Sequence, residues 1–122
     1  MKQMRKQRDI RKNLYSSYGI KTEAEIASYK EFISTRLSHF IYFIEIKINY
    51  RDVDLQYTVK TNNKSAKKYK HKNSIPVIYI PELIDCYYKL INEEKVFKLF
   101  GVKFDIDNQE IYPMIIFEGD NE

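Results

Sequence analysis

The most regular pattern of hydrophobic and polar positions lies between Phe40 and Tyr50. Every even position of this stretch is apolar, whereas the odd positions turn polar at Glu45, Lys47 and Asn49. An alternation with a period of two is typical of a strand that buries one face and exposes the other. We therefore predict a central strand whose even positions face the core.

A second strand is predicted directly after the first. Arg51 and Asp52 form a short polar break, and residues 53–60 then alternate again, with their odd positions mainly apolar. A two-residue turn places the even positions of the first strand opposite the odd positions of the second, so both apolar faces lie on the same side. The pattern thus predicts a β-hairpin.

Helical patterns predict two helices before this hairpin. Residues 1–18 form a basic segment that no Gly or Pro interrupts before Gly19, and we expect residues 1–12 to fray unless a partner orders them. Thr22 and Glu25 have the spacing of a capping box, which predicts a second helix over residues 22–38. Its apolar stripe would consist of Ile26, Tyr29, Ile33 and Leu37.

The second half of the chain begins with a basic loop. Residues 61–74 lack apolar periodicity and predict a loop that is long for a compact domain. Residues 75–80 then predict a short buried strand, and Pro81 suits the first turn of a helix. The remaining expected elements are a helix break at residues 92–95, a helix end at Gly101, and strands at residues 102–106 and 111–117, where Pro113 predicts an edge strand or a bulge.

These elements define an α+β domain with two N-terminal helices, a central β-hairpin, and then a strand, a helix and a second hairpin. We expect the helices to pack on one face of an antiparallel or mixed sheet. A chain of 122 residues, of which 43% are hydrophobic, has enough apolar material for one core. Residues 1–122 are therefore predicted to form a single domain.

Cysteine usage and hydropathy predict a cytoplasmic protein. Cys86 is the lone cysteine, so an intramolecular disulfide is excluded and a reducing compartment is expected. The basic N-terminal segment is not followed by the apolar run of a signal peptide. No stretch of about 18 apolar residues predicts a membrane span.

The net charge of +4 conceals a strong segregation of charge along the chain. Residues 1–12 contain six basic residues and one acid, and the range between Asp54 and Glu82 contains six lysines and no acid. After Lys103 every charged residue is acidic, and residues 118–122 form an acidic tail. We expect this tail either to shield a basic surface or to keep the protein soluble.

The residue types that common catalytic sites require are scarce. His39 and His71 are the only imidazoles, and Cys86 lies within a helical stripe, where a small buried hydrophobe is expected. The spacings of a zinc site, a P-loop and a dinucleotide-binding loop do not occur. We therefore expect no catalytic residue, no cofactor and no metal ion, and we predict that the protein is not an enzyme.

Two carboxylate patterns remain as candidates for metal chemistry, and both are more simply interpreted as charged, solvent-exposed positions. Glu45 and Lys47 resemble the end of the PD-(D/E)xK nuclease motif, and on a strand they would project from one face. The nearest upstream acid, Glu31, is predicted to lie in a helix, so the motif is incomplete and a metal-dependent nuclease ranks third among the functional hypotheses. The other pattern flanks a predicted turn and is more simply a solvated edge: Asp105, Asp107 and Glu110.

The basic segments give the stronger functional signal. The lysines of the 61–74 loop surround Tyr69 and His71, which combines charges that attract phosphate with a ring that can stack on a base. The cationic residues of the N-terminal helix recur at helical spacing and can follow a phosphate backbone. The predicted binding residues are Arg5, Arg8, Arg11, Lys12, Lys64, Lys67, Lys68, Tyr69, Lys70, His71 and Lys72.

In size and in lysine and tyrosine content, though in no motif, the chain resembles the short accessory proteins of phages and plasmids, including inhibitors of CRISPR nucleases. We predict a small non-enzymatic binding protein whose basic helix and loop engage nucleic acid or a nucleoprotein complex. The resemblance implies that this complex is a host nuclease such as a CRISPR effector. The alternative is a protein–protein adaptor, in which the hairpin meets a partner protein and the lysines only confer solubility.

Overall fold

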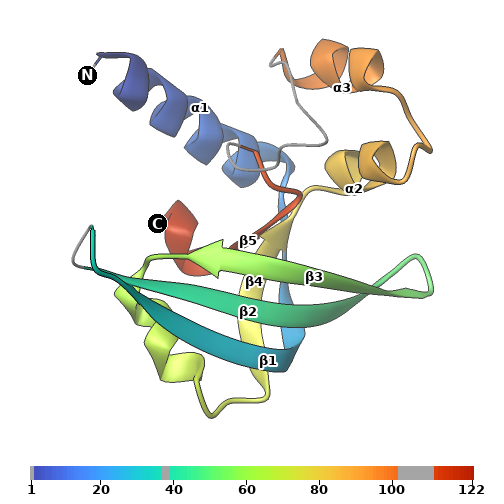
Figure 1. The fold of residues 1–122 in the computed structure, drawn as a ribbon. Coiled ribbons are helices and arrows are strands. Elements are labelled where there is room, and N and C mark those ends of the chain that lie inside the picture. The colour runs from blue at the N-terminus through green and yellow to red at the C-terminus, as the bar shows by residue number, and fades with distance from the viewer. Residues whose placement is uncertain (1, 37–38, 102–111) are drawn as a thin grey trace. The chain divides into compact units, whose positions relative to one another are not determined.

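The computed structural model of the chain describes residues 2–36, 39–101 and 112–122 (Figure 1). The chain is a mixed α+β protein, as predicted. Its elements, in chain order, are α1 (Lys2–Tyr18), β1 (Ile20–Ser34), β2 (His39–Tyr50), β3 (Val53–Thr61), the 3₁₀ helix η1 (Lys64–Tyr69), β4 (Ser74–Tyr79), α2 (Pro81–Tyr87), α3 (Glu93–Phe100), β5 (Ile115–Phe117) and the 3₁₀ helix η2 (Glu118–Asn121).

The chain divides into two compact units. One, called here the helical unit, consists of Met1–Ile20 and Tyr79–Met114. The other, called the sheet unit, consists of Lys21–Ile78 and Ile115–Glu122. Whether the two units fold as the predicted single domain stays a prediction.

The sheet has five strands in the order β3-β2-β1-β4-β5. Strand β2 is antiparallel to both of its neighbours, β1 and β3. Strands β3 and β5 stand at opposite ends of this order, yet they contact each other. The antiparallel sheet is therefore curled around its core (Figure 1).

The β2–β3 hairpin agrees with its prediction. Arg51 and Asp52 form a two-residue turn, with φ angles of 51° and 64°. Two left-handed residues are typical of a type I′ turn, whose twist matches that of the flanking strands. Ile44 pairs with Val59, and both are buried. The predicted core face of the central strand is confirmed by the buried side chains of Tyr42, Ile44, Ile46 and Ile48.

The predicted helix over residues 22–38 is wrong, because residues 20–34 form strand β1. A β-bulge explains the misleading pattern. Ile26 lies opposite Ile46 and Tyr29 lies opposite Ile44, so both belong to the core side of the strand. The bulge inserts Ala27 as an extra residue, which separates Ile26 from Tyr29 by three positions instead of two. This spacing imitates a helical stripe.

The apparent capping box lies inside β1. Ala24 is fully buried, whereas Glu23 and Glu25 are exposed, so this half of the strand alternates with a period of two. Strand β1 lies between β2 and β4 in the sheet. Strand pairing rather than a side-chain cap therefore satisfies the backbone around Thr22.

The helical unit confirms most of the predicted helices. Among residues 9–18 of α1, Leu14 and Tyr15 are buried, and the Tyr15 hydroxyl donates a hydrogen bond to the Pro113 carbonyl. Tyr18, at the end of α1, is 46% exposed and meets the Phe100 ring edge-on. Among the described residues, no helix is long and apolar enough to cross a membrane.

Helix α2 begins at Pro81 and α3 ends at Gly101, as predicted, but the helix breaks at residues 88–92, earlier than the predicted 92–95. Pro81 occupies the first turn of α2, and the chain breaks between Tyr87 and Glu93. The Asn92 side chain accepts a hydrogen bond from Lys95 N at 2.8 Å and caps α3, which ends at Gly101 with φ of 70°. The predicted strand at residues 102–106 lies outside the described residues, as do Asp105, Asp107 and Glu110. The last predicted strand is shorter than expected, since β5 covers only Ile115–Phe117.

Candidate nucleic-acid interface

The predicted basic loop is an ordered part of the sheet unit. The Asn63 side chain accepts a hydrogen bond from Ser65 N at 3.0 Å and caps η1. The same side chain donates to the Gly119 carbonyl at 3.1 Å, and Ala66 of η1 is fully buried. These contacts come from capping and one small side chain, so they leave no apolar periodicity in the sequence. The predicted loop thus contains a 3₁₀ helix that the sequence pattern did not predict.

The predicted acidic tail is also ordered, as η2. The Thr61 hydroxyl donates to Asp120 Oδ1 at 2.7 Å, and Lys21 Nζ lies 3.6 Å from Glu118 Oε1. Gly119 permits a close approach, because a Cβ at this position would lie 2.6 Å from the Phe117 ring. The contacts of Thr61 and Asn63 hold η2 next to the residues that precede η1, and the Lys21–Glu118 ion pair joins η2 to β1.

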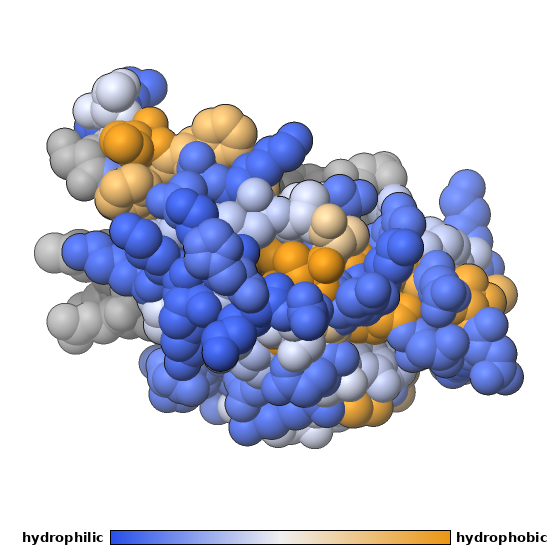
Figure 2. Space-filling model, turned by 90° about the horizontal axis from the view of Figure 1, so that it is seen from below, coloured by the Kyte–Doolittle hydropathy of each residue, from blue (hydrophilic) through white to orange (hydrophobic). Residues whose placement is uncertain are grey.

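The basic segment, residues 64–72, carries its lysines at the surface. Lys64, Lys67, Lys68 and Lys72 are exposed, and none of them has a carboxylate partner among the described residues. Lys70 differs, because its Nζ lies 3.8 Å from Glu31 Oε1. The face seen from below Figure 1, on the side where η1 lies, is mainly hydrophilic (Figure 2). Four lysines of this segment are thus available for phosphate groups.

The two aromatic residues of the basic segment differ in exposure. His71 is exposed. Tyr69 is half-buried, because its ring packs edge-on against Phe117 with the ring centroids 5.8 Å apart. Lys68 Nζ lies 5.2 Å from the centroid of the Tyr69 ring. Only part of the Tyr69 ring is therefore available for the predicted stacking on a base.

The predicted cationic residues of the N-terminal segment lie on α1, in the helical unit. The Arg11 guanidinium lies 5.9 Å from the centroid of the Tyr15 ring, and Lys12 is exposed. The side chains of Arg5 and Arg8 lie outside the described part of the structure. The helix is confirmed, but it belongs to a different unit from the basic segment, so the joint surface of helix and loop stays a prediction.

A second surface, which the sequence did not predict, lies on strands of the sheet unit. It is the side of β1–β3 that faces away from the core, called here the outer face. At its centre, Phe43 of β2 has Lys30 opposite on β1 and Lys60 opposite on β3. Phe32 is 53% exposed and meets Phe43 edge-on, with ring centroids 5.5 Å apart. Lys60 Nζ lies 5.9 Å from the Phe43 centroid.

The next row of the outer face is polar. Glu45 of β2 lies between Ser28 of β1 and Thr58 of β3, and the Ser28 hydroxyl donates to Glu45 Oε2 at 3.1 Å. The aromatic row and the polar row enclose a shallow hollow of about 440 Å³. Its lining consists of Ser28, Lys30, Phe32, Phe43, Glu45 and Thr58.

The structure changes the argument about a nuclease motif. Glu31 lies in strand β1, not in the predicted helix. Glu25, also on β1, lies opposite Lys47, so a neighbouring strand does supply an acid near the Glu45–Lys47 pair. Within residues 2–36, 39–101 and 112–122, however, no group of three or more His, Cys, Asp or Glu side chains is placed to hold a metal ion.

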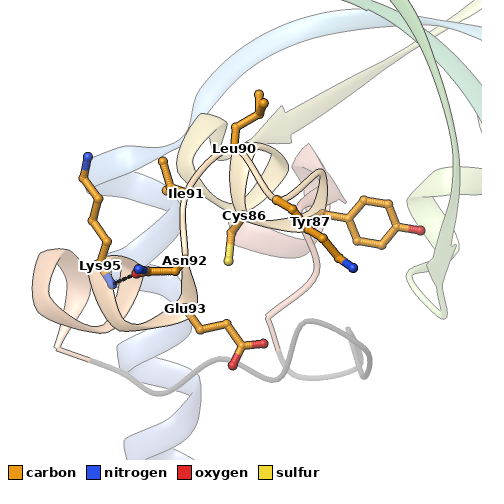
Figure 3. A pocket seen from close by; sticks show the side chains of 8 residues that line it. Cys86, Tyr87, Leu90, Ile91, Asn92, Glu93 and Lys95 are labelled. Carbon is orange, nitrogen blue, oxygen red and sulfur yellow. Dashed lines mark hydrogen bonds between the residues drawn. The ribbon is translucent and has the colours of Figure 1, made fainter.

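The helical unit contains a larger hollow, of about 1010 Å³, at the link between α2 and α3 (Figure 3). Cys86 is 4% exposed, and its side chain points to the side of the hollow where the Glu93 carboxylate lies. Burial, reinforced by the negative charge of Glu93, raises the pKa of the Cys86 thiol. A raised pKa keeps the sulfur protonated at neutral pH, which agrees with the predicted role of a small buried hydrophobe.

No family model, curated protein or solved structure matches the chain.

Proposed function

We propose that the protein is a non-enzymatic nucleic-acid-binding protein that holds single-stranded DNA or RNA against its sheet unit. The observation that carries this proposal is the pair of Phe rings flanked by Lys30 and Lys60 on the outer face. Proteins that bind single strands combine rings on which bases stack with cations that track the phosphates. The basic segment adds four exposed lysines to the same unit that have no carboxylate partner within residues 2–36, 39–101 and 112–122.

The exposure of these rings supports a binding role. The solvated side of an antiparallel sheet is normally polar, and an exposed Phe on it has a hydration cost that a ligand can remove. Ile41 pairs with Phe32 on the same side and extends the apolar surface. A base stacked there would lie between two ammonium groups, which favours a ligand with regularly spaced negative charges.

The strand order gives support by analogy. Strands β1, β2 and β3 form a meander, β1 also pairs with β4, and β3 contacts β5. This arrangement resembles the curled five-stranded sheet of the OB-fold. OB-folds bind oligonucleotides or oligosaccharides on the face of their second and third strands. The outer face includes this surface. Because one fold serves many functions, the argument still depends on the side chains of the face itself.

The test measures binding of fluorescent 12-nucleotide single strands by anisotropy at about 50 mM salt. Each base–aromatic stack contributes roughly 1–3 kcal/mol, so Phe32→Ser should weaken binding by about 5- to 150-fold. Tyr88→Ser in the helical unit removes a ring of similar exposure, 52%, and should change affinity less than about twofold. Wild-type protein that binds neither single-stranded DNA nor single-stranded RNA would overturn the proposal.

A protein–protein adaptor is the second candidate, and a separate observation favours it. Large apolar side chains of the helical unit are 44–65% exposed: Tyr87, Tyr88, Leu90, Phe97 and Leu99. Exposed apolar groups in such number are typical of surfaces that meet a protein. If the wild type binds no nucleic acid, these residues become the ones to substitute in a search for a protein partner. Inhibition of a nuclease such as a CRISPR effector stays a prediction from the sequence resemblance alone.

A further inference from the structure

We infer that Glu45 makes the outer face selective for bases that carry an exocyclic amino group, so that cytosine is preferred over thymine or uracil. This inference rests on the proposed function, because it assumes that a base occupies the hollow beside Phe43. It assigns Glu45 a role in specificity, in place of the catalytic role that the nuclease hypothesis gave it.

The geometry of the hollow supports this role. Of the described residues that line the hollow, Glu45 is the one acid, and it lies in the row next to Phe43 on the same strand and the same face. The Ser28 hydroxyl donates to Oε2 at 3.1 Å, which orients the carboxylate across the strand. A carboxylate has several acceptor sites, and one bond from Ser28 leaves Oε1 able to accept from a ligand.

The chemistry of the bases then decides the preference. A base stacked on Phe43 would bring its Watson–Crick edge to the polar row formed by Ser28, Glu45 and Thr58. Cytosine presents its N4 amino group there, and a carboxylate is a suitable acceptor for that group. Thymine and uracil present the O4 carbonyl oxygen instead, which a carboxylate repels. Glu45 would repel the phosphates of the bound strand. Lys30 and Lys60, on either side of Phe43, compensate for this repulsion with their positive charges.

The experiment compares the affinity of the wild-type protein for 12-nucleotide homopolymers of dC and dT at pH 7.5. We expect dC to bind at least about tenfold more tightly than dT, in the range of discrimination that one well-placed contact to a base edge provides. In the Glu45→Gln variant, the affinity ratio of dC to dT should fall to within about threefold. The ratio is the informative quantity, since removal of a negative charge raises the affinity for any polyanion.

Asp54→Asn is the matched control. Asp54 is exposed on β3 and lies opposite Asn49, at the far end of the hairpin from the hollow, and the substitution removes the same charge. It should raise both affinities alike and keep the wild-type ratio. Circular dichroism shows whether each variant folds. If Glu45→Gln does not fold, Ser28→Ala is measured in its place. The ratio of dC to dT affinity should also fall in Ser28→Ala, because the Glu45 carboxylate loses the hydrogen bond that orients it.

The outcomes separate the two proposals. If both homopolymers bind with equal affinity, or if Glu45→Gln and Ser28→Ala both keep the wild-type ratio, the inference about Glu45 is wrong and the proposed function stands. If neither homopolymer binds, the proposed function itself is wrong. A ratio that Asp54→Asn lowers as much as Glu45→Gln would show a general charge effect and overturn the specific role of Glu45.

Discussion

At the scale of single residues, Glu31 connects strand β1 to the basic segment. The Tyr29 hydroxyl donates to Glu31 Oε1 at 3.1 Å, and Lys70 Nζ lies 3.8 Å from the same oxygen. Burial, together with the hydrogen bond and the charge of Glu31 and a smaller effect of Tyr42, raises the pKa of Tyr29 to about 12. The phenol is thus held in its neutral form, in which it can donate.

This raised pKa predicts a loss of stability at alkaline pH. Tyrosine in an unfolded chain ionises near pH 10, whereas folded Tyr29 keeps its proton to about pH 12. Between these values the unfolded state binds fewer protons than the folded state. The stabilisation contributed by Tyr29 is therefore complete below pH 10 and falls as the pH rises toward 12.

Urea unfolding at pH 9, 10 and 11 tests this prediction. The free energy of unfolding should decline less with pH in Tyr29→Phe than in the wild type. An equally steep decline in the variant would show that Tyr29 does not contribute, and Tyr88→Phe is the control for loss of an exposed phenol.

At the scale of elements, the bulge in β1 lies where the strand bonds to both of its neighbours, β2 and β4. The pairing of β1 with β2 begins at Glu25, directly before the bulge, and Ile26 N donates on its other side to the Asn73 carbonyl, just before β4. Bulges bend a strand and increase its twist. The bulge therefore lies where the sheet has to curl.

Deletion of Ala27 tests this role. The remaining residues would form a regular ladder with β2, so the pairing partners are kept while the local bend is lost. We expect the free energy of unfolding in urea to fall by about 1–3 kcal/mol, within the range of mutations that disturb packing. Ala27→Gly keeps the bulge and should cost less than about 1 kcal/mol. A deletion variant as stable as the wild type would mean that the curl has another cause.

The same bulge marks how much of the fold and site could be predicted from the sequence. Strand β2 and its hairpin were predictable because every even position of β2 is apolar and their turn is short. Strand β1 was not, since the extra Ala27 changes the phase of the alternation. The aromatic pair was missed with it, because Phe32 can be placed beside Phe43 only when the register of β1 is known. One signal was present: Ile41 and Phe43 are apolar at positions of β2 that the alternation assigns to solvent.

At the scale of the whole molecule, charge separates into regions that the net value of +4 does not reveal. The six-residue helix η1 carries Lys64, Lys67 and Lys68, all exposed and without a carboxylate partner among the described residues. Each lysine that contacts a phosphate of a single strand releases counterions, so log K should fall with log[salt] by about 0.7 per contact. The variant with all three lysines changed to Ser should therefore bind single strands with a salt slope about two units flatter than the wild type.

A matched triple variant in the helical unit separates local contacts from net charge. Lys89, Lys95 and Lys98 are exposed, and their replacement by Ser removes the same charge. This variant should keep the wild-type slope to within about half a unit, because these lysines are not part of the proposed phosphate-binding surface and would release no counterions on binding. If both triple variants flatten the slope equally, the basic segment is not the phosphate-binding surface.

The hydrogen bond from Ile80 N to the Met114 carbonyl, at 3.0 Å, brings together the two ends of the segment that separates β4 from β5. Residues 81–113 therefore leave the sheet and return to it at nearly the same point. The entropy of closing such a loop grows only slowly with its length, by about 0.6 kcal/mol for each doubling. We therefore expect variants in which this segment is lengthened or shortened to keep the register of the sheet.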